Sequence, residues 1–359
     1  MMMKTGLLPL LALALLPACA GQGGEVAAIP LPAHEVQAKG ETAPVGSVNQ
    51  DAADDPAIWR NAANPAQSLI IGTDKKAGLY VYGLDGAVRN FDAAGLLNNV
   101  DLAGGADSAL IVASDRSDKR QSKLALFSLR FDDVTLKGLG TIDSGPGEAY
   151  GICLQRKDVG DDFTGLPQSI TAYAAIKDGT VREILLTRGE DGRYIGQMAR
   201  SWKLATQIEG CVTSPRTGDL YVGEEDVGIW RIRTAQPDAQ PEKFASVGEA
   251  DGLVDDVEGL AYAMNDDGRD YLVASSQGDS AYAVFDAQEG ALLGRFRIAD
   301  GTTDGVSETD GIELVLGDFG SDYPAGLFVA QDGNNPGGAQ NFKLVDWREV
   351  LRVLGLPRP

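Results

Sequence analysis

Glu258-Gly-Leu-Ala-Tyr-Ala263 begins the stretch of sequence that decides the fold. An acid and a glycine open a short apolar run, the turn Asn265-Asp-Asp-Gly268 reverses the chain, and a second run, Tyr271-Leu-Val-Ala-Ser-Ser-Gln277, ends in a polar loop. This order of signals predicts a β-hairpin. Because the strands of a hairpin are antiparallel, the start of the first lies at the same edge as the end of the second. Glu258 and Gln277 are therefore expected to be neighbours in space.

The same pattern occurs six times along the chain, and its second members are 41 to 61 residues apart. This spacing is typical of the four-stranded blade of a β-propeller, in which radial repetition protects sheet edges. A single acid-glycine pair also has an ordinary explanation as turn chemistry. Six matches in register, each pairing an opening acid with the polar residue of the following loop, favour an all-β, six-bladed propeller with all twelve positions on one surface around the channel. The pairs are Asp55 with Lys75, Asp101 with Arg116, Glu148 with Lys177, Glu209 with Glu225, Glu258 with Gln277, and Asp310 with Asp332.

The last predicted blade lacks an outer strand. Its third strand ends at Phe342-Lys-Leu-Val-Asp-Trp347, and residues 348–354 then have helical spacing. Residues near 35–46 are weakly β in pattern. We therefore expect this N-terminal segment to supply the missing strand and to close the ring.

The N-terminus has the pattern of an export signal. Lys4 precedes an apolar run at 7–16 that is too short to span a membrane, so residues 1–20 are predicted to be a signal peptide. Leu16-Pro-Ala-Cys19 also resembles a lipoprotein box, in which Cys19 would carry a lipid anchor. The expected location is periplasmic, membrane-anchored or secreted.

After the signal, residues 21–34 are rich in Gly, Ala and Pro and are predicted to be a flexible leader, which contains the only histidine, His34. Residues 35–359 are predicted to form one propeller domain, and we expect it to be a monomer. Cys153 and Cys211 each follow the opening motif of consecutive blades. A disulfide and two buried thiols are both compatible with this spacing.

Charge narrows the set of partners. The chain has 31 basic and 52 acidic residues, a net charge of −21, and no basic block. Nucleic acids and anionic lipid surfaces are therefore not expected as partners, because their binding depends on clustered Lys and Arg.

The histidine count narrows the chemistry. A phosphohistidine intermediate, a Ser-His-Asp triad and a His-rich metal site all need imidazoles that the predicted domain lacks. Oxygen ligands remain, and six to eight of them suit Ca²⁺. Solvated acidic loops are the alternative. The oxygen donors expected on the common face are Asp51, Asp54, Asp55, Glu148, Glu209, Glu224, Glu225, Asp226, Asp256, Glu258, Asp304, Glu308, Asp310 and Asp332, with Gln277 and Asn335.

A few cations stand at matching loop positions, namely Lys75, Lys76, Arg116, Lys119 and Lys177. Lys and Arg next to metal-binding carboxylates suit a polyanion such as a phosphate ester. Structural salt bridges to the nearby acids are the alternative. No Walker-type loop is present, so nucleoside triphosphate chemistry is not indicated.

These residues also resemble a known family, the β-propeller phytases, which are calcium-dependent enzymes that release phosphate from inositol hexakisphosphate. The resemblance covers about residues 41–347 and implies a six-bladed propeller. The matching motifs are Asp51-Ala-Ala-Asp-Asp-Pro-Ala-Ile-Trp59, Gly72-Thr-Asp-Lys-Lys-Ala-Gly-Leu79, Asn98-Asn-Val-Asp101, Glu148-Ala-Tyr-Gly151, Glu224-Glu-Asp226, Asp256-Val-Glu-Gly-Leu260, Ser275-Ser-Gln-Gly278, Thr309-Asp-Gly-Ile312 and Phe328-Val-Ala-Gln-Asp-Gly-Asn-Asn335.

Carried over position by position, the resemblance implies the roles of individual residues. It implies phosphate contacts from Lys75, Arg116, Tyr150 and Lys177, which also belong to the catalytic set together with Glu209 and Glu258. Lys76, a cation at the same loop, is expected to bind substrate as well. The resemblance implies several Ca²⁺ ions, and their ligands would be Glu41, Asp54, Asp55, the backbone of Pro56 and Val100, Glu209, Glu225, Asp256, Glu258, Gln277, Asp304, Asp310, Asp332 and Asn335.

The expected reaction is direct attack on phosphorus by a water that bridges Ca²⁺ ions, without a phosphoenzyme. The expected substrates are phytate or other inositol polyphosphates. Two alternatives share the acidic ring: a calcium-dependent propeller lactonase, which has no need of several cations, and a non-catalytic propeller that only binds ligands.

Overall fold

The computed structural model describes residues 32–155, 164–265 and 268–357. The predicted signal peptide, Cys19 and most of the leader lie outside the described residues, as do Asp266 and Asp267 of the hairpin turn. Among the described residues, no helix is long and apolar enough to cross a bilayer.

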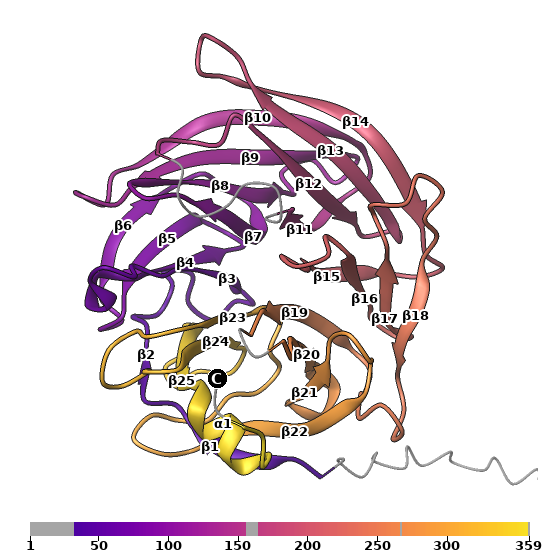
Figure 1. Cartoon of the computed structure of the whole chain (residues 1–359). Helices are drawn as coiled ribbons and strands as arrows, with labels where there is room; N and C mark the ends of the chain where they lie inside the picture. Colours follow the sequence, from indigo (N-terminus) through magenta and orange to yellow (C-terminus); the bar gives the residue numbers. More distant parts are fainter. Residues whose placement is uncertain (1–31, 156–163, 266–267, 358–359) are drawn as a thin grey trace, which may run out of the picture. The chain divides into compact units, whose positions relative to one another are not determined.

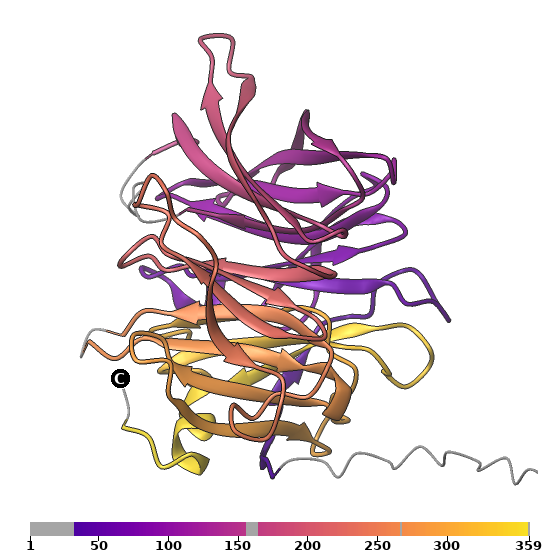
Figure 2. The same cartoon turned by 90° about the vertical axis from the view of Figure 1, so that its right-hand side faces the viewer.

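Six antiparallel sheets surround a central channel, which confirms the predicted six-bladed propeller (Figure 1). Each blade has four strands, and Figure 2 shows the same sheets from the side. The first three blades consist of β3 (Ala53–Trp59), β4 (Leu69–Asp74), β5 (Gly78–Gly83) and β6 (Val88–Asp92); β7 (Leu97–Gly104), β8 (Ser108–Asp115), β9 (Gln121–Arg130) and β10 (Leu136–Pro146); and β11 (Ala149–Leu154), β12 (Ser169–Ile176), β13 (Thr180–Arg188) and β14 (Tyr194–Lys203).

The other three blades follow the same order from the channel outwards. They consist of β15 (Ile208–Thr213), β16 (Leu220–Glu224), β17 (Gly228–Ile232) and β18 (Glu242–Ser246); β19 (Val257–Ala263), β20 (Tyr271–Ser276), β21 (Ala281–Asp286) and β22 (Leu292–Ala299); and β23 (Ile312–Leu316), β24 (Gly326–Asp332), β25 (Asn341–Asp346) and β2 (Gly40–Glu41). Two short 3-10 turns, Pro65–Gln67 and Gln277–Asp279, complete the strand connections.

The ring is closed by the N-terminal segment, as predicted. Strand β2 pairs with β25 in antiparallel register, with Gly40 opposite Leu344 and Glu41 opposite Lys343. A further strand, β1 (His34–Gln37), adds in parallel to the outer edge of β22. The N-terminal segment thus contacts the last two blades, and β1 begins at the last residue of the predicted leader.

A short helix, α1 (Trp347–Val353), follows β25 where the sequence predicted helical spacing. Asp346 caps it, because its side chain accepts a hydrogen bond from the backbone N–H of Arg348 at 3.1 Å. Trp347, Val350 and Leu351 are buried against the last blades.

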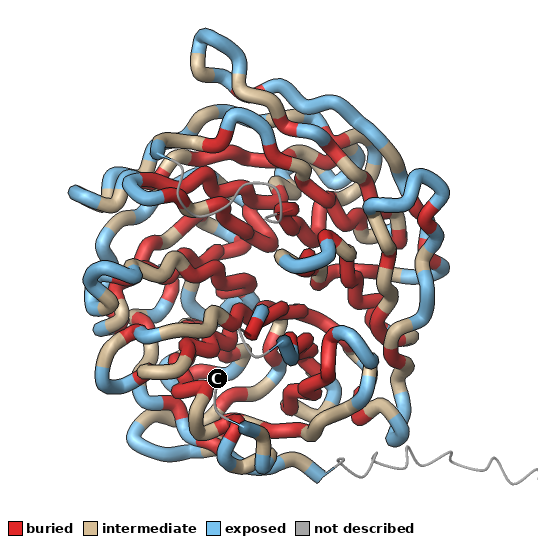
Figure 3. The backbone as a smooth tube through the Cα atoms, in the orientation of Figure 1, coloured by how far each residue is buried: buried red, intermediate tan, exposed pale blue. Residues whose placement is uncertain are grey.

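The hydrophobic core consists of six clusters, and each fills the space between two neighbouring blades. Apolar side chains from both faces of every blade are buried, because each sheet packs against a neighbour on either side. Figure 3 shows the inner strands as buried and the outer strands and loops as exposed. The inner strands are therefore held rigidly at the channel.

A disulfide joins Cys153 on β11 to Cys211 on β15. It links the inner strands of the third and fourth blades, so the structure decides between the two states that the sequence left open.

Candidate functional site

One edge of the blades carries the predicted site residues. Strand register places Val257 opposite Ser276, Ala53 opposite Asp74, and Leu97 opposite Asp115. Each inner strand therefore begins where the second strand of its blade ends. Glu258 and Gln277 line the same cavity, as the first hairpin predicted.

The functional residues of the inner strands lie at β-bulges. Five of the six inner strands shift register against their neighbour within the first few residues, where the strand enters the channel. A bulge re-aims side chains and locally interrupts pairing. The residues inside these shifts include Asp54 and Asp55, Asn98, Tyr150, Glu209, and Glu258.

The glycines that follow Glu209, Glu258 and Asp310 allow neighbouring blades to approach closely. A Cβ on Gly259 would lie 2.7 Å from the backbone oxygen of Asp310 and 2.8 Å from the nitrogen of Ile312. A Cβ on Gly210 would lie even closer to the backbone oxygen of Glu258. These glycines thus lie at close contacts between neighbouring blades.

A cavity of about 760 Å³ opens at this edge. It contains carboxylates and cations together, as the sequence predicted for a common face. The predicted site residues that line it are Lys75, Lys76, Arg116, Tyr150, Glu209, Glu258, Gln277, Asp310 and Asn335.

Three buried carboxylates meet beside this cavity, from Glu209, Glu225 and Glu258. One oxygen of each lies within 4.8 Å of the other two. Burial raises the pKa of Glu209 and Glu258 well above the usual value, and nearby carboxylates raise it further. The Oε2 atom of Glu258 is buried without a hydrogen-bond partner. A multivalent cation fits this group, because it would neutralise three like charges and give the orphaned oxygen a partner.

Lys75 faces three further carboxylates. Its Nζ lies 2.7 Å from Asp51, 3.1 Å from Asp54 and 2.7 Å from Asp310. Burial alone would lower the pKa of Lys75, but these three charges outweigh it and raise the pKa. Gln277 donates from Nε2 to the other oxygen of Asp310 at 2.7 Å. The predicted residues Asp54, Asp310 and Gln277 are thereby brought together around one ammonium group.

Two more cations lie at this site: Arg116 lines the cavity, and Lys177 contacts Tyr150, which also lines it. Arg116 donates to Glu148 at 2.8 Å and to Asn98 at 2.5 Å, and the Nδ2 of Asn98 donates to Glu209 at 2.6 Å. Asn98 was not among the predicted site residues, although it opens the motif Asn98-Asn-Val-Asp101. Asn98 therefore links the Arg116 cation to the Glu209 carboxylate through two consecutive hydrogen bonds.

Tyr150 connects the remaining cation to this wall. Lys177 donates to the Tyr150 hydroxyl at 2.6 Å, and both Lys177 and Arg116 lie over the tyrosine ring, at 4.6 and 4.9 Å from its centroid. Burial raises the pKa of Tyr150 despite these cations. The hydroxyl is therefore neutral at ordinary pH and can donate to an anion.

Three predicted ligands lie deeper, in the channel. Asp55, Pro56 and Val100 line a separate cavity of about 20 Å³, enough for one water-sized occupant. The Oδ2 of Asp55 accepts from the backbone N–H of Val100 at 3.0 Å, and burial raises the pKa of Asp55 well above its usual value. The size and donor chemistry of this cavity fit a single cation.

Four predicted ligands lie around one lysine. The Nζ of Lys343 lies 2.5 Å from Asp304, 3.0 Å from the side-chain oxygen of Asn335 and 3.5 Å from Asp332, and it also pairs with Glu41. Burial alone would lower the pKa of Lys343, but these acids raise it, so the group stays charged. Lys343 itself was not among the predicted site residues.

Two predicted site residues, Asp256 and Lys76, belong to none of the three groups around Glu258, Lys75 and Lys343. Asp256 accepts a hydrogen bond from the backbone of Gln277 through its carbonyl oxygen at 2.9 Å, and burial and Asp226 raise its carboxyl pKa. The backbone N–H of Lys76 donates to Asp74 at 2.9 Å, and Lys76 lines the large cavity.

Comparison with known proteins identifies the family. A family model of the phytases matches residues 4–356. The chain belongs to the phytase family. It is 35% identical over 336 residues to a 3-phytase of Bacillus subtilis (strain 168), with 89% of this chain and 86% of that protein aligned. As a member of this family, the chain is a phosphoric monoester hydrolase.

A solved structure shares only the fold. The Malassezia sympodialis allergen Mala s 1 superimposes with a TM-score of 0.55 and 12% identity, over 84% of this chain and 95% of the allergen. At this identity the likeness supports the propeller architecture and carries no functional argument.

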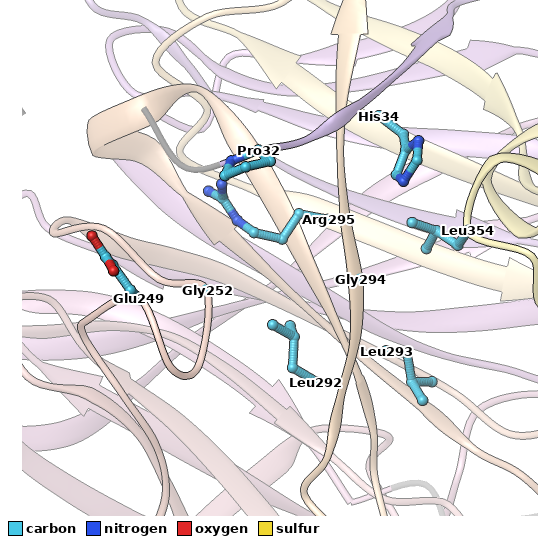
Figure 4. A pocket seen from close by; sticks show the side chains of 9 residues that line it. All are labelled: Pro32, His34, Glu249, Gly252, Leu292, Leu293, Gly294, Arg295 and Leu354. Atoms are coloured by element: carbon cyan, nitrogen blue, oxygen red, sulfur yellow. The ribbon is translucent and has the colours of Figure 1, made fainter. Parts of the chain in front are cut away.

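A third cavity of this phytase-family chain, about 280 Å³, is lined by none of the predicted site residues (Figure 4). Its lining comes from β1, β22, the Glu249 to Gly252 loop and Leu354. His34 lines this cavity and not the large one.

Proposed function

We propose that this protein hydrolyses the phosphate monoesters of phytate, inositol hexakisphosphate, in a calcium-dependent reaction that releases phosphate and lower inositol phosphates. The observation that carries the proposal is the 760 Å³ cavity in which Lys75 and Arg116 stand beside Glu209 and Glu258. Phytase-family membership and the similarity to a 3-phytase support the substrate.

The cations provide the phosphate-binding part of the site. Arg116 presents a planar group of donors that matches phosphate oxygens, while Lys177 and the Tyr150 hydroxyl lie on the same wall. Of the three acids on Lys75, Asp51 is 68% exposed, so an incoming phosphate can displace it at little cost. A lactone offers no charge for these groups, which argues against the lactonase alternative.

Calcium would be held by Glu209, Glu225 and Glu258 and by the Asp55, Pro56 and Val100 cavity, with Asp54, Asp256, Gln277 and Asp310 as further donors. The raised pKa values and the orphaned oxygen of Glu258 support this assignment. When bound, calcium would neutralise charge on the phosphoryl oxygens and make a nearby water more acidic.

The reaction that fits these residues is direct hydrolysis. The oxygen of a water forms a bond to phosphorus, the bond from phosphorus to the ester oxygen breaks, and the leaving oxygen ends as an inositol hydroxyl. Arg116, Lys177 and Lys75 hold the phosphoryl oxygens so that attack and departure are in line. Neither the single histidine nor the two disulfide-bonded cysteines line the large cavity, so none of them is in position to serve as nucleophile.

The test is release of inorganic phosphate from phytate by the purified protein, in calcium and in excess chelator. We expect turnover in calcium, none in chelator, and recovery when calcium is restored. Lys177→Met should weaken phytate binding, whereas Lys137→Met on the exposed strand β10 is the matched control.

Two outcomes would contradict parts of the proposal. Full activity in excess chelator would end the calcium requirement. Hydrolysis of simple lactones with no phosphate release from phytate would support the lactonase instead.

Export to an oxidising compartment is also part of the proposal. The Cys153–Cys211 disulfide supports it, because such bonds persist outside the reducing cytosol. The mass of the mature N-terminus distinguishes cleavage after Ala20 from a lipid anchor on Cys19. Size-exclusion chromatography with light scattering tests the expected monomer.

A further inference from the structure

Lys343 lies at the closure of the ring and is fully buried. It sits on β25, directly opposite Glu41 of β2, the strand that completes the last blade. A lysine with no exposed side chain needs charge partners, because burying an unpaired ammonium is very costly. All of its partners are residues that the sequence predicted as calcium ligands.

The three protons of the ammonium group have three acceptors. Lys343 donates to the carboxylates of Glu41 and Asp304 and to the side-chain oxygen of Asn335. The Nδ2 of Asn335 donates to the backbone oxygen of Ala339 at 2.7 Å, which turns its oxygen towards the lysine. All three N–H donors of the ammonium group are therefore satisfied by these acceptors.

The acids have further donors of their own. Asn341 donates to Glu41 at 2.9 Å, and the Oδ1 of Asp332 accepts from the backbone N–H groups of Ser307 and Asn334 at 3.3 Å. The Oδ2 of Asp332 has no hydrogen-bond partner among the described residues, and Lys343 is the cation that faces it, at 3.5 Å. A calcium ion needs six to eight oxygens at about 2.3–2.6 Å. The nitrogen of Lys343 is hydrogen-bonded to both Glu41 and Asp304, so it occupies the space between their carboxylates.

We infer that the Lys343 ammonium is the resident cation of this corner and takes the place of the calcium ion that Glu41, Asp304, Asp332 and Asn335 would otherwise hold. The ring closure between β2 and the last blade is then built from the chain alone. Calcium acts at the Glu209, Glu225 and Glu258 group and in the channel, and its removal leaves the N-terminal strand in place. This inference does not depend on the reaction that the protein catalyses.

Counting calcium ions by equilibrium dialysis, with protein and metal measured in the same sample, tests the inference. Lys343→Ala removes the ammonium and leaves room among the four oxygen donors. We expect this variant to bind one more calcium ion per chain than the wild type, and its melting temperature to rise with calcium more steeply. Lys39→Ala is the matched control, because Lys39 is a nearby lysine that pairs with Asp346 instead.

A second variant decides the question if Lys343→Ala fails to fold. Glu41 is 37% exposed, so Glu41→Gln is a mild change. If Lys343 is the cation, Glu41→Gln binds as many calcium ions as the wild type. Loss of one ion per chain in Glu41→Gln, or an unchanged count in folded Lys343→Ala, would overturn the inference. A calcium-soaked crystal with an ion among the four oxygens would do the same.

Discussion

Gly259→Ala is the sharpest test of how the blades position the carboxylates. The new Cβ would lie 2.7 Å from the backbone oxygen of Asp310, and ordinary contacts begin at 3.4 Å, so the two blades must separate by about 0.7 Å (3.4 less 2.7 Å). Both neighbours are backbone atoms at the entry to the inner strand β23 and cannot rotate away as a side chain could. The hydrogen bond from Gly259 N–H to Asp310 at 2.7 Å would lengthen as well.

The expected effects follow from that separation. Overpacking of this kind costs roughly 1–3 kcal/mol, and for domains of this size each kcal/mol lowers the melting temperature by about 2–4 °C. Metal sites tolerate deviations of only about 0.2 Å in ligand distance. Because Glu258 precedes this glycine, calcium affinity should fall, and turnover should fall roughly tenfold to a hundredfold, since an error near 1 Å costs about a hundredfold.

The assay compares melting temperature, calcium affinity and phosphate release well below the melting temperature. Gly138→Ala is the control, because Gly138 is exposed on β10 and a Cβ there meets no atom within 4 Å. A Gly259→Ala protein with wild-type turnover and calcium affinity would show that close blade contact does not set the geometry of the carboxylates.

Three more predictions follow from the same structure. Glu258→Gln should lower phosphate release by roughly a hundredfold to a thousandfold. It should also raise the melting temperature in chelator, because one of three carboxylates that repel one another is lost. Glu190→Gln on the surface is the control, and a lower melting temperature of Glu258→Gln in chelator would contradict this prediction. Burial raises the pKa of Asp310 to about 7 despite Lys75, so the folded protein holds a proton that the unfolded chain releases near pH 4. The free energy of unfolding in chelator should therefore fall as the pH rises from about 4 to 7. Melting temperatures that rise over this pH range would refute the prediction. Replacing Cys153 and Cys211 by Ser opens a link between residues 58 apart, which costs roughly 4 kcal/mol by loop entropy; unchanged denaturant midpoints would contradict it.

The blade count, the ring closure and the common face could be predicted because each depends on a local, repeated signal. The acid, the apolar run and the turn recur within one blade, so strand register follows from sequence spacing. Lys343 could not be found in this way. Its partners Glu41 and Asp304 are 302 and 39 residues away, and only the closed ring brings them together. A lysine between Phe342, Leu344 and Val345 in strand β25 was the one available signal, because a lysine among apolar neighbours must find charge partners.

Asn98 and the bulges were missed for a different reason. Strict alternation along a strand predicts one residue in two at the channel, but a bulge changes which side chains point inward. The shift between Leu97 and Val100 lets Asn98 contact both Arg116 and Glu209, and no local pattern distinguishes such a strand from a regular one. Direct contact between a bulged residue and two charged partners shows that the bulges are part of the site and not defects of the sheet.

Bulges, glycines and charge together explain why a stable ring can gather so many carboxylates. The six apolar clusters hold the inner strands, and the glycines let those strands approach until their acids face one another. Repulsion among Glu209, Glu225 and Glu258 is then a cost that folding alone does not relieve, and it becomes binding energy for a multivalent cation. Around Lys343 the same kind of repulsion is relieved within the chain. Of these two groups of acids, only Glu209, Glu225 and Glu258 are left without a cation from the described part of the chain itself, so this group should make the protein depend on metal.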